Sequence, residues 1–147
     1  MAWLEIFSIL HFIGIAWGVG GATAAAVISA KSDKDPEISH AAMRIMPAIS
    51  KLIWLGLILL IISGIGISAL SQWPIDKNML LVKHVLVALI VVAGIILGIN
   101  AKKMHALAPK PKEKPSAKFL AAKKLLKAFS IINLILWYAV TIMSVFL

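Results

Sequence analysis

The chain has 147 residues, of which 61% are hydrophobic and only 14% are charged, and its mean hydropathy is +0.98. This composition excludes an ordinary soluble domain and predicts that the lipid bilayer is the solvent. The net charge of +9 does not indicate nucleic-acid binding, because the basic residues gather in two stretches that separate apolar runs.

Four long apolar runs follow one another, at about 4–28, 52–70, 79–100 and 128–147. Each is close to the roughly 20 residues with which an α-helix crosses about 30 Å of hydrocarbon. The runs are continuous, whereas the strands of a membrane barrel alternate polar and apolar residues in segments of about 10. We therefore expect one all-α domain, 1–147, an integral membrane four-helix bundle with helices at about 3–30, 39–71, 77–102 and 117–147.

The basic residues predict the orientation of these helices. All fifteen Lys and Arg residues except Lys77 and Lys83 fall in or beside the connections that follow the first and third helices. By the positive-inside rule these connections are cytoplasmic, and both termini and the 71–78 loop are outside. No basic segment precedes the first run, so we expect no cleavable signal peptide. The chain is thus expected to be a multi-pass protein of the cytoplasmic (inner) membrane.

The two halves of the chain resemble each other. Aligning the first helix with the third places His11 on His84, Gly21 on Gly94 and Ala25 on Gly98. This similarity predicts two parallel-repeated helical hairpins related by an axis along the membrane normal, with the first and third helices facing each other across it. Chance similarity between apolar, Ala-rich helices is the alternative.

Two histidines lie inside predicted spans, where an imidazole is costly unless something satisfies it. His11 is about 8 residues into its span and His84 about 5 to 7 residues into its own, which places both about 8 to 12 Å below the outer surface. Equal depth on facing helices suits the two axial ligands of a haem that lies between them. His40 and His105 belong to the cytoplasmic ends and need no such explanation.

Small residues follow each histidine at helical spacing. They are Gly14, Gly18, Gly21 and Ala25 after His11, and Ala88, Gly94 and Gly98 after His84. We expect them to clear room for a porphyrin, with ordinary small-residue packing between membrane helices as the alternative. Lys83, beside His84, is expected either to pair with a haem propionate or to extend its ammonium to the interface.

The available ligands fit haem b, with His11 and His84 as the axial ligands of its iron, better than another metal centre. Zinc or copper held by protein alone needs a third and a fourth ligand, and the chain has no cysteine. No Ser-His-Asp or paired-carboxylate pattern is visible, so the sequence assigns no catalytic residue.

Over nearly its whole length the chain resembles the small four-helix membrane families that include HemJ-type protoporphyrinogen oxidases and copper-resistance protein D-like domains. The resemblance rests on Leu10-His11-Phe12-Ile13, Trp17, Pro47, Trp73, and Lys83 with Leu86-Val87. It implies functional roles for His11 and Lys83, and it assigns none to His84. The HemJ-type Gly-Tyr-His stretch is replaced here by Ala93-Gly94, so the resemblance favours haem binding over protoporphyrinogen oxidation.

The expected function is therefore that of a membrane b-type haem protein, active in electron transfer or redox chemistry near the outer face. A bis-histidine iron has no open coordination position, which suits electron transfer more than oxygen chemistry. Quinol, superoxide or an external protein are the expected partners, and the chain is expected to form a homo-oligomer or to join a larger complex. The alternatives are copper or small-solute transport, or a non-haem accessory subunit.

Overall fold

The computed structural model describes residues 2–71, 76–109 and 113–144. It contains four helices, α1 (Ala2–Ser32), α2 (Pro36–Leu70), α3 (Lys77–Ala106) and α4 (Ala117–Met143), and no strand within these residues. All four are long and apolar enough to cross a membrane. The predicted all-α four-helix bundle is thus confirmed, and the chain is a multi-pass membrane protein. Trp73 lies outside the described residues.

Polar side chains set the start of three helices. The Asp35 carboxylate accepts the backbone N–H of Glu37 at 2.8 Å, and the Asp76 carboxylate accepts that of Asn78 at 2.8 Å. The Ser116 hydroxyl accepts a backbone N–H of α4 in the same way. Such caps satisfy N–H groups that the first helical turn leaves without a partner. The Asp35 cap explains why α2 begins at residue 36 rather than at the expected 39.

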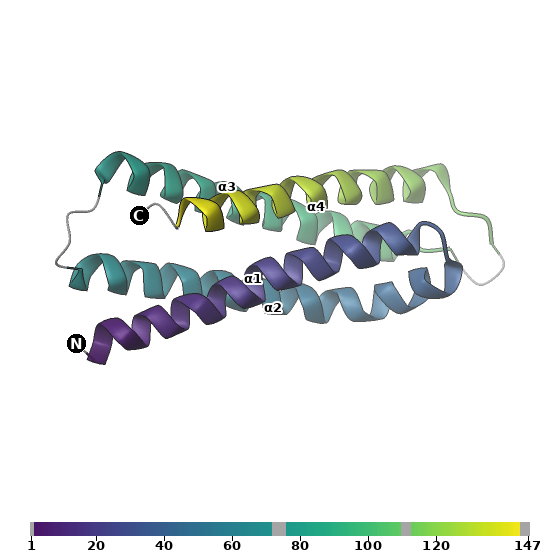
Figure 1. Ribbon diagram of the computed structural model, residues 1–147. Coiled ribbons are helices and arrows are strands. Elements are labelled where there is room, and N and C mark those ends of the chain that lie inside the picture. Colours follow the sequence, from purple (N-terminus) through teal and green to yellow (C-terminus); the bar gives the residue numbers. More distant parts are fainter. Residues whose placement is uncertain (1, 72–75, 110–112, 145–147) are drawn as a thin grey trace.

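The helices form two antiparallel pairs (Figure 1). α1 packs along α2, α3 packs along α4, and α1 also contacts α4, so that α1 and α3 occupy opposite corners of the bundle. The first residues of α1 and the last of α4 lie at the same end of the bundle, which we call the terminal end. The α1–α2 and α3–α4 connections lie at the other end, the basic end.

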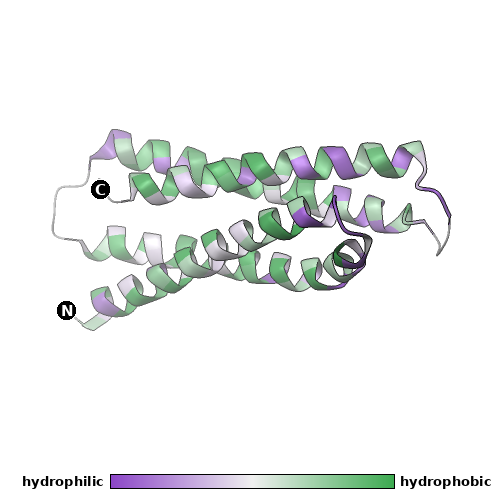
Figure 2. Cartoon of the chain, turned by 45° about the vertical axis from the view of Figure 1, so that its right-hand side comes forward, coloured by the Kyte–Doolittle hydropathy of each residue, from purple (hydrophilic) through white to green (hydrophobic). Residues whose placement is uncertain are grey.

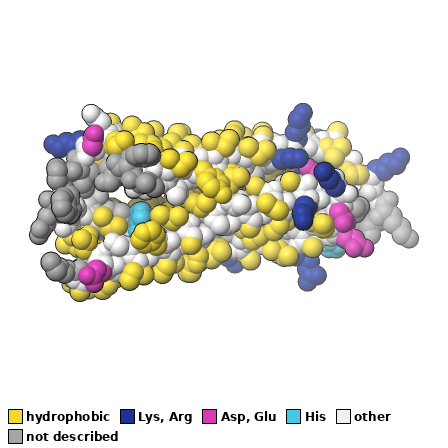
Figure 3. Space-filling model, in the orientation of Figure 1, with side chains coloured by type: hydrophobic (Ala, Val, Ile, Leu, Met, Phe, Trp, Pro, Cys, Tyr) yellow, Lys and Arg dark blue, Asp and Glu magenta, His cyan; other side chains and the backbone are white. Residues whose placement is uncertain are grey.

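Charge and hydropathy divide along the bundle axis. Apolar residues cover the middle of all four helices (Figure 2), while most Lys and Arg side chains gather at the basic end (Figure 3). There the Asp33 carboxylate, in the α1–α2 connection, accepts the ammonium groups of Lys123 at 2.9 Å and Lys127 at 2.5 Å. The hydrogen bonds from Lys127 and Lys123 hold the pKa of Asp33 below its ordinary value. This ion cluster ties the first helix pair to α4.

Glycines bring α1 and α2 into backbone contact. A Cβ placed on Gly56 of α2 would lie 2.7 Å from the backbone N of Gly18 and 2.8 Å from the carbonyl O of Gly14. A Cβ on Gly18 would also collide with the indole ring of Trp137 in α4, which is completely buried. Side chains larger than hydrogen at these positions would hold the helices apart, as in other small-residue contacts between membrane helices.

α2 and α3 have almost no direct backbone contact. Towards the basic end the indole of Trp54 spans the gap between them, since a Cβ on Gly94 would lie 3.1 Å from its Cζ2. The small buried core, formed by Ala22, Leu57, Ile90, Trp137 and Val140, lies between the two helix pairs. Towards the terminal end the α2–α3 gap widens into a cavity.

Candidate functional site

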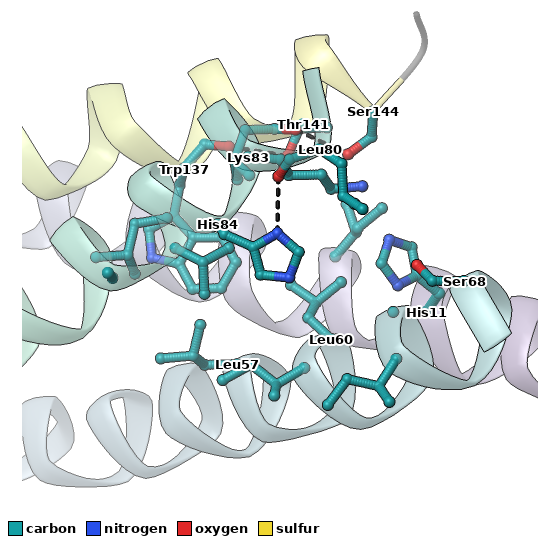
Figure 4. Close-up of a pocket in the computed structure, with 18 of the residues that line it drawn as sticks. His11, Leu57, Leu60, Ser68, Leu80, Lys83, His84, Trp137, Thr141 and Ser144 are labelled. Atoms are coloured by element: carbon teal, nitrogen blue, oxygen red, sulfur yellow. Dashed lines mark hydrogen bonds between the residues drawn. The ribbon is translucent and has the colours of Figure 1, made fainter. Parts of the chain in front are cut away.

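A cavity of about 610 Å³ lies between the helix pairs in the half of the bundle near the terminal end. This is within the 300–1,000 Å³ range of sites for organic ligands and cofactors. All four helices contribute to its wall, which is mostly apolar and includes Leu57, Leu60, Val87 and Trp137. The polar groups of the wall are few, and two of them are the imidazoles of His11 and His84 (Figure 4).

His11 reaches the cavity from α1 and is held by α2. Its Nδ1 lies 2.9 Å from the hydroxyl oxygen of Ser63, a side chain with no exposed surface. The Ser63 hydroxyl is also 2.6 Å from the carbonyl oxygen of Leu59, one turn earlier in α2. Because a carbonyl only accepts, the single hydroxyl proton of Ser63 goes to Leu59, and Ser63 accepts a proton from His11.

This arrangement determines the tautomer of His11. Nδ1 carries the proton, so Nε2 of the neutral ring is left with a free lone pair. A hydrogen bond from Nδ1 to an oxygen acceptor is the usual way in which proteins orient a histidine that binds a metal through its other nitrogen.

His84 reaches the same cavity from α3 and has the same tautomer for a different reason. Its Nδ1 lies 2.7 Å from the carbonyl oxygen of Leu80, one turn earlier in its own helix (Figure 4). Since that carbonyl can only accept, Nδ1 is protonated and Nε2 is again free. Two imidazoles on opposite corners of the bundle thus bring unprotonated Nε2 atoms to one cavity.

One cation and several hydroxyl groups accompany the histidines. Lys83 lines the cavity, is half-buried, and forms no ion pair with any residue that the structure describes. Thr141 and Ser144 of α4 donate their hydroxyl protons to the carbonyls of Trp137 and Val140 at 2.9 and 2.8 Å. Their oxygens can still accept hydrogen bonds, so this part of the wall is the most polar.

The cavity opens sideways between α2 and α3. Exposed residues of both helices line it there, among them Ile65 and Ala69 of α2 and His84 and Ala88 of α3. These positions belong to helices that are long and apolar enough to cross a membrane.

The structure brings together some of the residues that the sequence assigned to a cofactor. Those in the wall are His11, Lys83, His84 and Ala88. The glycines lie elsewhere: Gly14 and Gly18 are at the contact with Gly56, Gly21 faces Ile53, Gly94 faces Trp54, and Gly98 has open space around it. Gly14, Gly18, Gly21 and Gly94 therefore pack closely against neighbouring helices, the alternative that the sequence left open, whereas Gly98 does not.

Two residues of the site, Ser63 and Gly64, have no feature in the sequence that marks them as part of a site. Ser63 is one of several serines in apolar runs, and only the fold shows that it meets His11. Gly64 borders the cavity, and a Cβ there would lie 3.9 Å from Cε1 of His11. Trp137 forms part of the wall although its position in α4 is equally consistent with a core residue.

The donor set of the cavity is two imidazoles and one amine. Within residues 2–71, 76–109 and 113–144, no three His, Asp or Glu side chains gather where they could hold a metal ion together. Comparison with known families, curated proteins and solved structures finds no match to this chain. The resemblance to HemJ-type and copper-resistance protein D-like proteins therefore stays a prediction, and the geometry of the cavity is the basis for a function.

Proposed function

We propose that the protein is a membrane b-type haem protein in which His11 and His84 are the axial ligands of the iron. One observation carries the proposal: the two imidazoles enter one cavity, and in each the Nδ1 proton is given to an oxygen while Nε2 stays free. Solvent-facing histidines have no need of this arrangement. It suits the axial ligands of a haem, because the iron binds the unprotonated nitrogen and proteins usually orient such a ligand through its other ring nitrogen.

The other residues of the cavity fit the same group. Haem needs only two ligands from the protein, whereas a bare copper or zinc ion needs three or four. The apolar wall matches a porphyrin, and the volume of about 610 Å³ matches a large organic cofactor. Lys83 offers its ammonium to a propionate, which would give this cation a partner. When bound, haem supplies one-electron redox chemistry at its iron.

The sideways opening favours a redox partner that dissolves in the membrane. The α2–α3 gap faces hydrocarbon, so a quinol can approach the cavity edge next to His84, where the wall is exposed. An external protein or superoxide would instead approach over the terminal end. We therefore rank quinol first among the electron donors, with the protein acting in electron transfer or as an oxidoreductase.

The proposal is tested by the visible spectrum of the purified protein. We expect a red preparation whose reduction with dithionite gives the narrow α and β bands of six-coordinate, low-spin haem. His11→Ala and His84→Ala should each convert the iron to high spin or remove the haem, because one imidazole is lost. His40→Ala and His105→Ala, at the basic end, are the matched controls and should keep the wild-type spectrum. A colourless protein from haem-sufficient cells would contradict the proposal.

The orientation in the membrane decides which partners reach the site. We propose that the terminal end lies outside the cytoplasmic membrane, because most of the basic residues are at the opposite end. In Ser71→Cys and Ser116→Cys variants on intact spheroplasts, a membrane-impermeant maleimide should label position 71 and spare position 116. The reverse labelling would place the cavity in the cytoplasmic half of the membrane.

A further inference from the structure

The two histidines differ in how firmly the protein holds them. His11 is half-buried and bonds to a side chain on another helix, whereas His84 is exposed and bonds only to a carbonyl of its own helix. Ser63, the partner of His11, has no exposed surface. The first imidazole is thus fixed between two closely packed helices, and the second stands at the open side of the cavity.

The cost of moving each ring follows from these bonds. If the His11 ring turns away, the bond that joins α1 to the buried Ser63 of α2 is lost, and the Ser63 hydroxyl keeps only its donation to the carbonyls of its own helix. If the His84 ring turns away, the Leu80 carbonyl still accepts the backbone N–H of the helix. The bond lost in this case lies within one helix, whereas the bond of His11 joins two helices.

The His11 ring also has less free space around it than the His84 ring has. A Cβ on Gly64 would already be 3.9 Å from Cε1 of His11, and Leu60 and Gly14 fill the neighbouring α1–α2 contact. His84 instead borders the opening between α2 and α3, where Ile65 and Ala88 are exposed. A ring leaving the cavity on that side enters lipid and meets no packed helix.

We infer that His11 is the permanent ligand, fixed by Ser63, and that His84 is an exchangeable ligand that gives way to small neutral molecules, such as diatomic gases, arriving between α2 and α3. This inference rests on the proposed haem site and adds to it. It makes Ser63 a positioning residue and gives the protein a way to bind an external ligand at a site that is otherwise closed by two imidazoles.

Carbon monoxide added to the dithionite-reduced, haem-loaded protein is the first test. His84→Ala should keep its haem, in five-coordinate form, and bind CO more tightly than the wild type. His11→Ala should lose haem during purification. Ser63→Ala should release haem to an acceptor such as apomyoglobin about 10- to 100-fold faster, the usual effect of removing the partner of a metal-binding histidine. Ser8→Ala is the matched control, because Ser8 bonds to a carbonyl of its own helix and lies outside the cavity wall.

A second test needs no haem. Diethyl pyrocarbonate acylates unprotonated imidazoles, and peptide mass spectrometry reports the rate at each histidine of the haem-free protein in detergent. We expect His84 to react faster than His11, with the exposed His40 and His105 as references for full access. Ser63→Ala should accelerate the reaction of His11 and leave that of His84 unchanged.

The two tests separate the inference from the proposed function. A colourless wild-type protein overturns the haem proposal, and the acylation rates still report whether the histidines are held unequally. A red protein in which both alanine variants keep haem and bind CO equally overturns the inference alone. Equal acylation of His11 and His84 overturns it as well, and it does so even if Ser63→Ala does not fold.

Discussion

α2 has two neighbours of opposite kinds. Towards α1 it presents glycines, and the two backbones touch at Gly56. Towards α3 it faces a gap, which Trp54 fills near the middle of the bundle and which is hollow towards the terminal end. The closest helix contact of the bundle and its cavity are thus on two sides of one helix.

The difference between these two sides of α2 shows how a helix bundle in a membrane keeps a cavity between its helices. Lipid chains give little hydrophobic drive to close a gap between helices, so helices approach where their surfaces fit and stay apart where they do not. The glycine contact fixes α1 against α2, and the indole of Trp54 limits the approach of α3. The cavity is therefore a consequence of rigid packing on either side of it.

The largest loss of stability is expected from Gly56→Leu, on the side of α2 that packs against α1. The new Cβ would lie 2.7 and 2.8 Å from backbone atoms of α1, which can move only with the whole helix. Overpacking costs about 1–3 kcal/mol and occasionally more, so the unfolding temperature in detergent should fall sharply. Gly98→Ala is the matched control, because a Cβ there meets nothing within 4 Å. It should be neutral or stabilise by up to about 1 kcal/mol. Equal unfolding temperatures for the two variants would contradict the packing argument.

On the open side we expect substitution to affect the ligand and spare the fold. Ala88→Phe places a ring at the mouth of the cavity, where the side chain is exposed and no packed neighbour resists it. Haem content, measured by pyridine haemochrome, should fall well below that of the wild type while the unfolding temperature of the haem-free protein hardly changes. Leu89→Phe, at the adjacent position outside the cavity wall, should keep normal haem content. Full loading of Ala88→Phe would mean that the opening is not part of the site.

The smallest loss of stability is expected from a change in the ion cluster at the basic end. Asp33→Asn removes the negative charge that pairs with Lys123 and Lys127, but the cluster is partly exposed, so we expect a loss of at most about 1 kcal/mol at neutral pH. The hydrogen bonds of these lysines lower the pKa of Asp33, so its contribution is present above the ordinary carboxyl pKa of about 3.9. It is lost as the pH falls through the lower pKa of the folded state.

Denaturant unfolding in detergent at pH 7 and at successively lower pH measures this difference between wild type and Asp33→Asn. The two curves should converge at the acid end. Lys124→Gln, which removes a neighbouring charge outside the cluster, is the control and should show no such convergence. A constant difference at every pH would assign the effect to something other than the carboxylate.

The fold could be predicted from the sequence because each helix carries its own signal. Apolar runs of sufficient length predict the spans. They do not fix the helix starts, which depend on the caps formed by Asp35, Asp76 and Ser116, and the expected start of α2 is therefore three residues late. The site could be predicted only in part. An imidazole in a membrane span is rare and costly, so His11 and His84 stand out. A serine in such a span is common, so Ser63 does not.

The glycines show a second limit of sequence reasoning. Helical spacing places Gly14, Gly18 and Gly21 on one face of α1, but it does not say what that face meets. A small residue admits a cofactor and a neighbouring helix equally well. In the structure this face meets neighbouring helices, because Gly56 of α2 and Trp137 of α4 occupy the space beside it.

The contact at Gly56 also has a consequence for the order of events during synthesis. α1 and α2 are joined by only three residues, 33–35, and together they contain the closest helix contact and the His11–Ser63 hydrogen bond. All the atoms that orient the first imidazole therefore exist before the ribosome has translated α3. His84 follows with the second helix pair, and the gap beside it stays open to the bilayer. A large apolar ligand can therefore bind after the last helix has been inserted, and insertion of the chain does not depend on the ligand.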